Sequence, residues 1–297
     1  MSGLQAALRQ DRAQLGIAMM LGAWLLFSFV DTSVKWLVIA GLPAMQLAFM
    51  RYVGHFLISL IDVGRGGFTK NRFRTDHFWL VTFRGLLLVS ATCFNFYALK
   101  TLSLTLTSAI MFSAPILVCA LAVPLLGERV GPWRWFAILL GFAGVMVVIR
   151  PFGEGFTWVA LLPLYNALAL AFYSIITRKL SGIVATSTMQ FYMGFQGTLI
   201  LLPFAIWQWE NPTTYLDWAI MFALGVWAWG GHELLTRAHS FASANTLMPF
   251  TYSFMIYLTI ASYVVFNHIP DGFTVLGAGI IVVSGLIIWA RERKETR

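Results

Sequence analysis

The chain has 297 residues, of which 59% are hydrophobic and 11% are charged, and its mean hydropathy is +0.77. Soluble domains carry about 25% charged residues, so this composition excludes an ordinary soluble domain and indicates an all-helical integral membrane protein. The net charge of +8 does not indicate a nucleic-acid partner, because most basic residues fall on one side of the expected membrane topology.

Ten apolar runs are long enough to cross about 30 Å of hydrocarbon as helices. The runs are continuous rather than alternating, which favours helices over the strands of a membrane barrel. Residues 1–14 are polar, and the run after them is too long for a signal-peptide core, so we expect the first span to be retained. The predicted spans are 15–38, 44–63, 78–98, 104–126, 133–150, 156–177, 187–206, 217–236, 243–265 and 272–290.

The Lys and Arg residues are divided unevenly between alternate connections of these spans. Fifteen of the 20 lie in the N-terminal segment, in every second loop and in the tail at 291–297, whereas the opposite set holds only Lys35, Lys100 and Arg150. Cytoplasmic connections are enriched in Lys and Arg. We therefore predict that both termini are cytoplasmic and that the protein is a multi-pass protein of the cell's inner (plasma) membrane.

The chain shows signs of an internal repeat. An offset of 140 residues superimposes the span ends and matches Gly85 to Gly225, although identities are few. Five spans separate equivalent positions, and an odd number makes the second half enter the membrane upside down, which is the plan of many secondary transporters. The hypothesis is two inverted five-helix repeats, at 15–150 and 156–290, with a binding site near the midplane between them.

Two segments resemble the ends of EamA-type repeats of the drug/metabolite transporter superfamily. They read LTLTSAIMFSAPILVCALAVPLLGERVGPWRWFAILLGFAGVMVVIRP and ANTLMPFTYSFMIYLTIASYVVFNHIPDGFTVLGAGIIVVSGLIIWARE. The resemblance covers residues 15 to 292 and implies ten helices around a central cavity and export of small metabolites. Within that superfamily the chain is similar to the YddG-type amino acid exporters, which implies aromatic and other neutral amino acids as solutes. Gly127 and Glu128 match the family pattern, whereas Asn267 and His268 depart from it in the second half.

The first span carries polar side chains that need an environment other than lipid. Trp24, Ser28, Asp31 and Lys35 are spaced by four, three and four residues, which places them on one helical face. A charge at the bilayer centre costs roughly 2.5 to 3.5 kcal/mol. Asp31 followed by Lys35 has the orientation favoured for a helical ion pair. The open alternatives are a structural pair, with Lys35 reaching the headgroups, and a role in substrate binding or gating.

Polar and aromatic positions on other spans are candidates for the wall of a central cavity. Hydroxyls, amides and rings with few charges suit a small zwitterionic or amphipathic solute. Each residue alone is also explained by helix packing, since Ser, Thr and Asn hold membrane helices together. The candidate substrate-binding residues are Trp24, Ser28, Asn95, Phe112, Tyr165, Asn166, Trp227 and Tyr252.

Four further positions are candidates for gating and bending. His232 and Glu233 lie near the inner end of the eighth span and are candidates for an inner gate, with a structural pair to Arg237 as the alternative. Pro115 and Pro249 are candidate kinks or hinges, because a proline inside a helix frees a backbone carbonyl. Mere bending of the helix is the alternative for both prolines.

Two arginines lie within spans rather than at their ends. Arg51 and Arg84 are each about a third of the way from a span end. Snorkelling to the headgroups and pairing with Asp62 or another carboxylate are both open for them.

The sequence lacks the motifs of common enzyme sites. HExxH, GxSxG, Asp-x-Asp and P-loop patterns are absent, and Cys93 and Cys119 lie apart in apolar runs, which indicates neither a disulfide nor a metal pair. We expect no cofactor and no metal. The expected function is a secondary transporter that exports small metabolites, amino acids first, by alternating access. The alternatives are export of a purine, sugar or drug, a channel, or an integral membrane enzyme. The expected partners are the solute and the lipid bilayer, and the oligomeric state stays open, a monomer included.

Overall fold

The computed structural model describes residues 13–65, 75–126, 131–150, 156–180, 183–241 and 247–295 of the chain. Within these ranges every regular element is a helix. Residues 1–12 of the predicted N-terminal segment lie outside them. The elements are α2 (Ala13–Ile39), α3 (Ala44–Arg65), α5 (Phe78–Leu99), α6 (Leu104–Met111), α7 (Ala114–Leu126), α8 (Pro132–Ile149), η1 (Trp158–Ala160), α9 (Leu161–Leu180), α10 (Thr186–Trp207), α11 (Tyr215–Phe241), η2 (Met248–Tyr252), α13 (Ser253–Phe266) and α14 (Gly272–Glu295).

The helices fit the ten predicted spans. By length and composition, five helices of the described chain are able to cross a membrane: Gln14–Ile39, Ala44–Asp62, Phe78–Leu99, Trp158–Thr177 and Thr186–Trp207. Shorter apolar stretches run over Leu104–Val118, Trp135–Ile149, Phe250–Phe266 and Gly272–Ile287. The remaining long helix, α11, has 27 residues and carries the polar side chains of His232, Glu233 and Arg237 in its last turns.

Two of the predicted spans are not continuous helices. The fourth divides into α6 and α7 at residues 112–113, and the ninth divides into η2 and α13 after Tyr252. Pro115, the second residue of α7, has no N–H to donate to the carbonyl of Met111, so a regular helix does not continue through this point. The two breaks are 140 residues apart, which is the offset of the predicted repeat.

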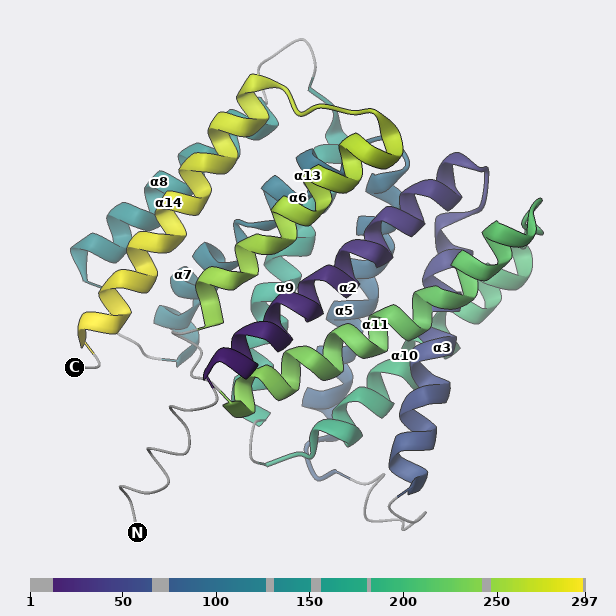
Figure 1. The fold of residues 1–297 in the computed structure, drawn as a ribbon. Coiled ribbons are helices and arrows are strands. Elements are labelled where there is room, and N and C mark those ends of the chain that lie inside the picture. The colour runs from purple at the N-terminus through teal and green to yellow at the C-terminus, as the bar shows by residue number, and fades with distance from the viewer. Residues whose placement is uncertain are drawn as a thin grey trace.

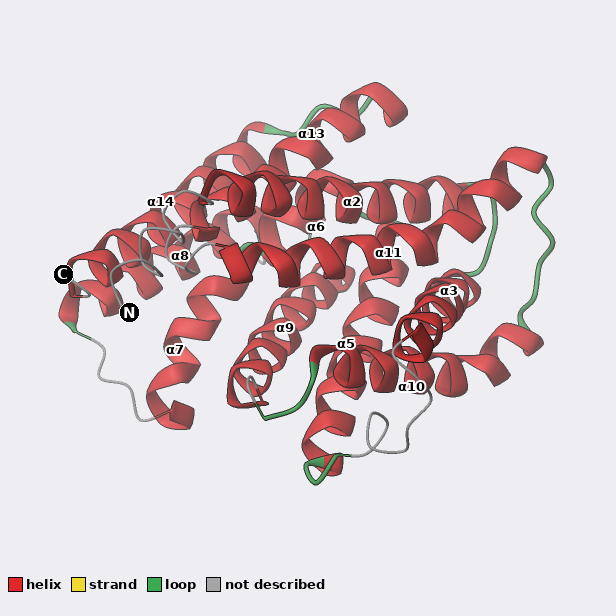
Figure 2. Cartoon of the chain, turned by 60° about the horizontal axis from the view of Figure 1, so that its bottom comes forward, coloured by secondary structure: helices red, strands yellow, loops and turns green. Residues whose placement is uncertain are grey.

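The helices form a bundle with a helix pair at each edge. α8 packs along α14 at one edge and α3 packs along α10 toward the other, with α2 and α11 between them (Figure 1). α5 packs on α9 on a second layer, and α6 meets α13 near the centre (Figure 2). With the 140-residue offset, each edge pair joins equivalent helices, and the packing of α2 on α11 has its counterpart in that of α9 on α5. The two halves therefore pack on each other reciprocally.

Small residues set the crossing of α8 and α14. A Cβ built on Gly144 would lie 2.9 Å from the carbonyl oxygen of Gly277. The positions equivalent to these two are 284 and 137, and there Ser284 Oγ donates a hydrogen bond to the carbonyl of Ala137 at 2.5 Å. The same close contact thus occurs twice, with the two helices exchanged, because small side chains let membrane helices approach closely.

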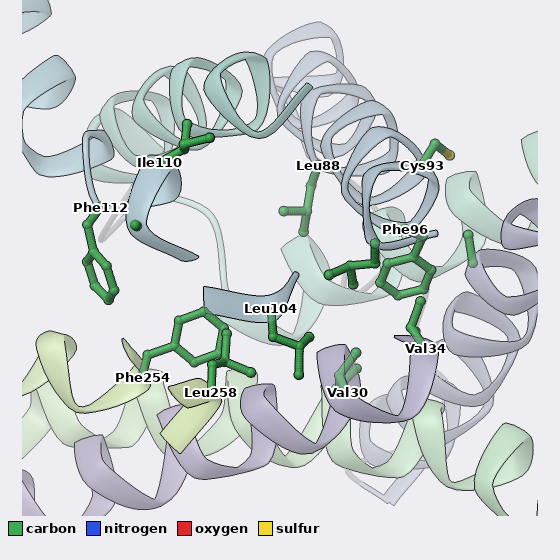
Figure 3. Packing of buried hydrophobic residues seen from close by; sticks show 14 of the residues in the cluster. Val30, Val34, Leu88, Cys93, Phe96, Leu104, Ile110, Phe112, Phe254 and Leu258 are labelled. Carbon is green, nitrogen blue, oxygen red and sulfur yellow. The ribbon is translucent and has the colours of Figure 1, made fainter. Parts of the chain in front are cut away.

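The apolar core runs through both halves of the bundle. Its buried side chains include Val34 of α2, Leu104 of α6 and Leu258 of α13 (Figure 3). Large apolar side chains are also exposed on the outside, for example Leu139 of α8 and Ile206 of α10, which are 67% and 70% exposed. Such an outward apolar surface is what a lipid environment requires.

Candidate functional site

The two helix breaks meet at the centre of the bundle. Phe112, after the end of α6, and Tyr252, the last residue of η2, have ring centroids 5.2 Å apart. Phe112 also lies 6.4 Å from Phe254 of α13, and Figure 3 shows both of these side chains in the same space between the helices. Trp24 of α2 lies 5.2 Å from Phe254. These four rings, from both halves of the chain, are called the aromatic cluster below.

Polar groups lie beside the aromatic cluster. Asn166 of α9 is buried and its amide donates to the sulfur of Met111 at 3.3 Å, one residue before Phe112. Ser113 Oγ donates to the carbonyl of Ile110 at 2.8 Å within the break. An interrupted membrane helix presents polar backbone and side-chain groups to the protein interior, as in the sites of many transporters.

The predicted hinge prolines occupy matching places after the breaks. Pro115 is the second residue of α7, and Pro249 is the second residue of η2. Their side chains lie outside the described part of the structure. Proline is accepted in the first turn of a helix because the N–H there has no intrahelical acceptor, so each proline starts a new helical segment.

Asp31 and Lys35 have separate partners and do not form the expected ion pair. Asp31 is 7% exposed and accepts a hydrogen bond from the amide of Asn95 at 3.2 Å. Lys35 Nζ donates to the carbonyls of Leu99 and Leu102 at 3.0 and 2.6 Å. These carbonyls lie at the end of α5, where helix carbonyls lack intrahelical donors and the dipole is negative. The lysine therefore caps a neighbouring helix instead of neutralising the aspartate.

Three other candidates lie at helix–helix contacts outside the aromatic cluster. Tyr165 hydroxyl is 2.9 Å from Ser90 Oγ, between α9 and α5. The Trp227 ring lies 5.8 Å from that of Phe29, between α11 and α2. Ser28 is buried and donates to the carbonyl of Leu25 on its own helix at 2.7 Å. For these residues the structure shows the packing role that was the alternative in the sequence.

His232 and Glu233 are neighbours in α11 with different surroundings. His232 packs against the rings of Phe27 and His55, with centroids 5.0 and 5.7 Å away. Glu233 forms an ion pair with Arg237 at 2.7 Å. Glu233 also lines a pocket of about 200 Å³ between α3, α10 and α11, whose other lining residues are Ser59, Asp62, Thr186, Ser187, Gln190 and Trp229.

The interior also holds basic residues to which sequence reasoning gave no role. Arg51 and Arg84 are 7% and 5% exposed, and His55 is 1% exposed. We call these three residues the basic cluster. Arg51 and His55 are four residues apart on α3 and therefore share a face, which is the signal that would have found the histidine. Among the described residues, no group of three His, Cys, Asp or Glu residues is placed to hold a metal ion.

Comparisons with known proteins agree on one family. The model of the "EamA-like transporter family" matches residues 14–150 and again 157–290. A riboflavin transporter of Rhizobium johnstonii is 28% identical over 100% of this chain and 98% of its own length. An S-adenosylmethionine uptake transporter of Rickettsia prowazekii is 30% identical over 92% and 93%. The pseudopaline exporter CntI of Pseudomonas aeruginosa is 26% identical over 96% and 99%.

A solved structure supports the fold. A crystal structure of a protein superposes with a TM-score of 0.64 over 96% of this chain and 99% of that chain, at 19% identity. None of the three relatives described above is named as an amino acid exporter, which was the finer expectation from the sequence.

Proposed function

Because this chain belongs to the EamA-like transporter family, we propose that it carries a small organic solute across the membrane by alternating access. It is a multi-pass membrane transporter of small molecules rather than a protein of a different class. The relatives include proteins named for uptake and for export, so we propose no fixed direction of transport and no catalytic activity.

The aromatic cluster is the proposed solute site. One observation carries this proposal: Phe112 and Tyr252 stand at equivalent breaks of the two halves, 140 residues apart, and their rings are in contact. A site at such a place changes its access when one half rocks against the other. Pro115 and Pro249, which start the segments after the breaks, are the proposed hinges.

The proposed solutes carry a flat ring system. Riboflavin and S-adenosylmethionine, which appear in the names of two relatives, both contain fused heteroaromatic rings. Aromatic side chains hold such rings by stacking and edge-to-face contact, and the aromatic cluster supplies four rings. Aromatic amino acids fit the same contacts and remain a second candidate class, although no named relative above supports them.

The proposed membrane topology places both ends of the chain in the cytoplasm of a bacterial cell. The excess of Lys and Arg on one side supports it, as do the two family matches at 14–150 and 157–290, which lie close to the predicted repeats. α2 begins and α14 ends toward the same end of the bundle (Figure 1), as an even number of crossings requires.

The test is counterflow in proteoliposomes with riboflavin, S-adenosylmethionine and tryptophan as separate solutes. We expect Phe112→Ala to lower counterflow of the accepted solute about tenfold, because the lost ring contact is worth roughly 1.5 kcal/mol. Phe142→Ala is the matched control, since this ring is 43% exposed on α8. Failure of the wild-type protein to exceed empty vesicles with any solute of a broad metabolite panel would refute the transport proposal.

A further inference from the structure

The basic cluster contains a buried guanidinium with incomplete hydrogen bonding. Arg84 Nε donates to Thr177 Oγ1 at 2.7 Å, and its Nη2 bonds the hydroxyl of Tyr173. The guanidinium carbon also lies 4.1 Å from the centroid of the Tyr173 ring. Its Nη1 is buried and has no hydrogen-bond partner. All of these contacts are to neutral groups, so the side chain keeps an unspent donor and a full positive charge.

Arg51 is held in the same way. Its Nη1 donates to Thr92 Oγ1 at 2.9 Å, and its guanidinium lies 5.0 Å from the centroid of the Tyr52 ring. Among the described residues, the ion pairs are those between Arg150 and Asp271 and between Glu233 and Arg237, and neither includes Arg51 or Arg84. Two buried arginines are therefore fixed by hydroxyls and rings in place of carboxylates.

His55 adds a third polar group to this part of the bundle. It is 1% exposed and its Nε2 has no hydrogen-bond partner. The charges of both Arg51 and Arg84 act on this histidine, which shows that the three side chains share one electrostatic environment. A buried cation without a carboxylate carries a desolvation penalty of several kcal/mol, and a buried polar atom without a partner adds to it.

A pocket connects this region with one end of the bundle. Gln190 lines the pocket of about 200 Å³ between α3, α10 and α11 and also interacts with His55. Ser59, one turn beyond His55 on α3, lines the same pocket. The buried Oγ of Ser59 and Oε1 of Gln190 both lack a hydrogen-bond partner. Unpartnered polar atoms thus run from the pocket toward the basic cluster.

We propose that Arg84, together with Arg51 and His55, binds the anionic group of the transported solute, a carboxylate or a phosphate. This inference rests on the proposed transport function. An anion would accept the unused Nη1 donor of Arg84 and offset the buried positive charge. The planar guanidinium suits both groups because it presents its donors in a fork.

The experiment compares solutes that differ by one anionic group. The pairs are L-tryptophan with tryptamine for a carboxylate, and riboflavin 5′-phosphate with riboflavin for a phosphate. Each competes for counterflow in proteoliposomes. We expect the anionic member of at least one pair to compete about tenfold more strongly than its neutral or cationic counterpart, since a hydrogen bond to a charged group is worth about that factor.

Variants locate the preference in the basic cluster. Arg84→Gln is expected to remove the tenfold preference while leaving competition by the partner without the anion unchanged, and Arg84→Lys is expected to retain part of it. Arg237→Gln is the matched control, because the Arg237 side chain is 62% exposed and already paired.

The outcomes separate the two proposals. Absence of any counterflow contradicts the transport proposal. Counterflow without a preference for the anionic member of either pair, or an Arg84→Gln variant that keeps the preference, overturns the anion site and leaves transport standing. If Arg84→Gln fails to fold, the wild-type preference together with Arg51→Gln decides the matter by the same criteria.

Discussion

Buried charges occur in two regions of this bundle, and the protein satisfies them differently. In the first, Asp31 accepts from Asn95, and Lys35 donates to the two carbonyls at the end of α5. In the second, the basic cluster, Arg84 and His55 keep buried nitrogen atoms without a hydrogen-bond partner. The first region is complete within the chain, whereas the second has capacity left over.

The difference teaches where to look for a solute. A buried polar group that is fully paired is explained by the fold itself. A buried group that lacks a partner is destabilising, so its retention calls for a further interaction. By this criterion Asp31 and Lys35 belong to the scaffold, although they first attract attention in the sequence, and the basic cluster belongs to function.

The largest effect is expected from separating the helices around the basic cluster. Gly54 precedes His55 on α3, and a Cβ built on it would lie 2.7 Å from the Cα of Gly225 on α11. Backbone atoms cannot rotate away, so Gly54→Ala is expected to lower the free energy of unfolding by about 3 kcal/mol. Thermal unfolding of the purified protein in detergent should show a midpoint ~6 °C or more below that of the wild type.

The matched control for this change is Gly279→Ala on α14, where a built Cβ meets nothing within 4 Å. That substitution should leave the midpoint unchanged or raise it slightly, because Ala favours a helix over Gly. Equal midpoints for Gly54→Ala and the wild type would show that α3 and α11 do not approach each other in this way.

A smaller effect is expected in the completed region. Lys35→Gln removes the ammonium group from the carbonyls of Leu99 and Leu102 at the end of α5. Hydrogen bonds to a charged group contribute roughly 1.5 to 3 kcal/mol, so we expect a loss of about 2 kcal/mol in stability. Lys100→Gln, at an exposed position next to the same helix end, serves as the control. A scaffold role also predicts that solute affinity is unchanged, which counterflow measures.

The smallest effect is expected at a charge pair on the rim of the bundle. Arg150 and Asp271 are 2.5 Å apart with side chains 42% and 47% exposed, and such pairs contribute about 0.5 kcal/mol. Asp271 also accepts from the N–H of Thr274 at 2.6 Å at the start of α14. Asp271→Asn keeps a good helix cap and loses the charge, so a small loss of stability at neutral pH is expected.

The pH dependence of this pair follows from the carboxyl group. The N–H of Thr274, and less strongly Arg150, lower the pKa of Asp271 below its ordinary value of 3.8. A lowered pKa in the folded state means that the stabilisation is present above the unfolded value and is lost as the pH falls through the folded value. The unfolding midpoints of wild type and Asp271→Asn should therefore converge on acidification below about pH 4. Midpoints that diverge there would contradict this assignment.

Sequence reasoning succeeded with properties that are local to each span. Hydropathy located the spans to within a few residues, and helical spacing placed Trp24, Asp31 and Lys35 on one face of α2. The same reasoning was wrong about the Asp31–Lys35 ion pair, because an i, i+4 spacing does not exclude better partners on a neighbouring helix. It also treated two interrupted spans as continuous, although Pro115 and Pro249 gave a signal there.

The sequence by itself determined that the chain crosses a membrane with ten apolar segments in two similar halves, because hydropathy and small-residue patterns are written along each segment. Only the tertiary structure decided which side chains meet. The contact of Phe112 with Tyr252, the capping of α5 by Lys35 and the unpaired nitrogen of Arg84 depend on which helices lie adjacent. That adjacency comes from packing between residues far apart in the sequence, which no single segment encodes.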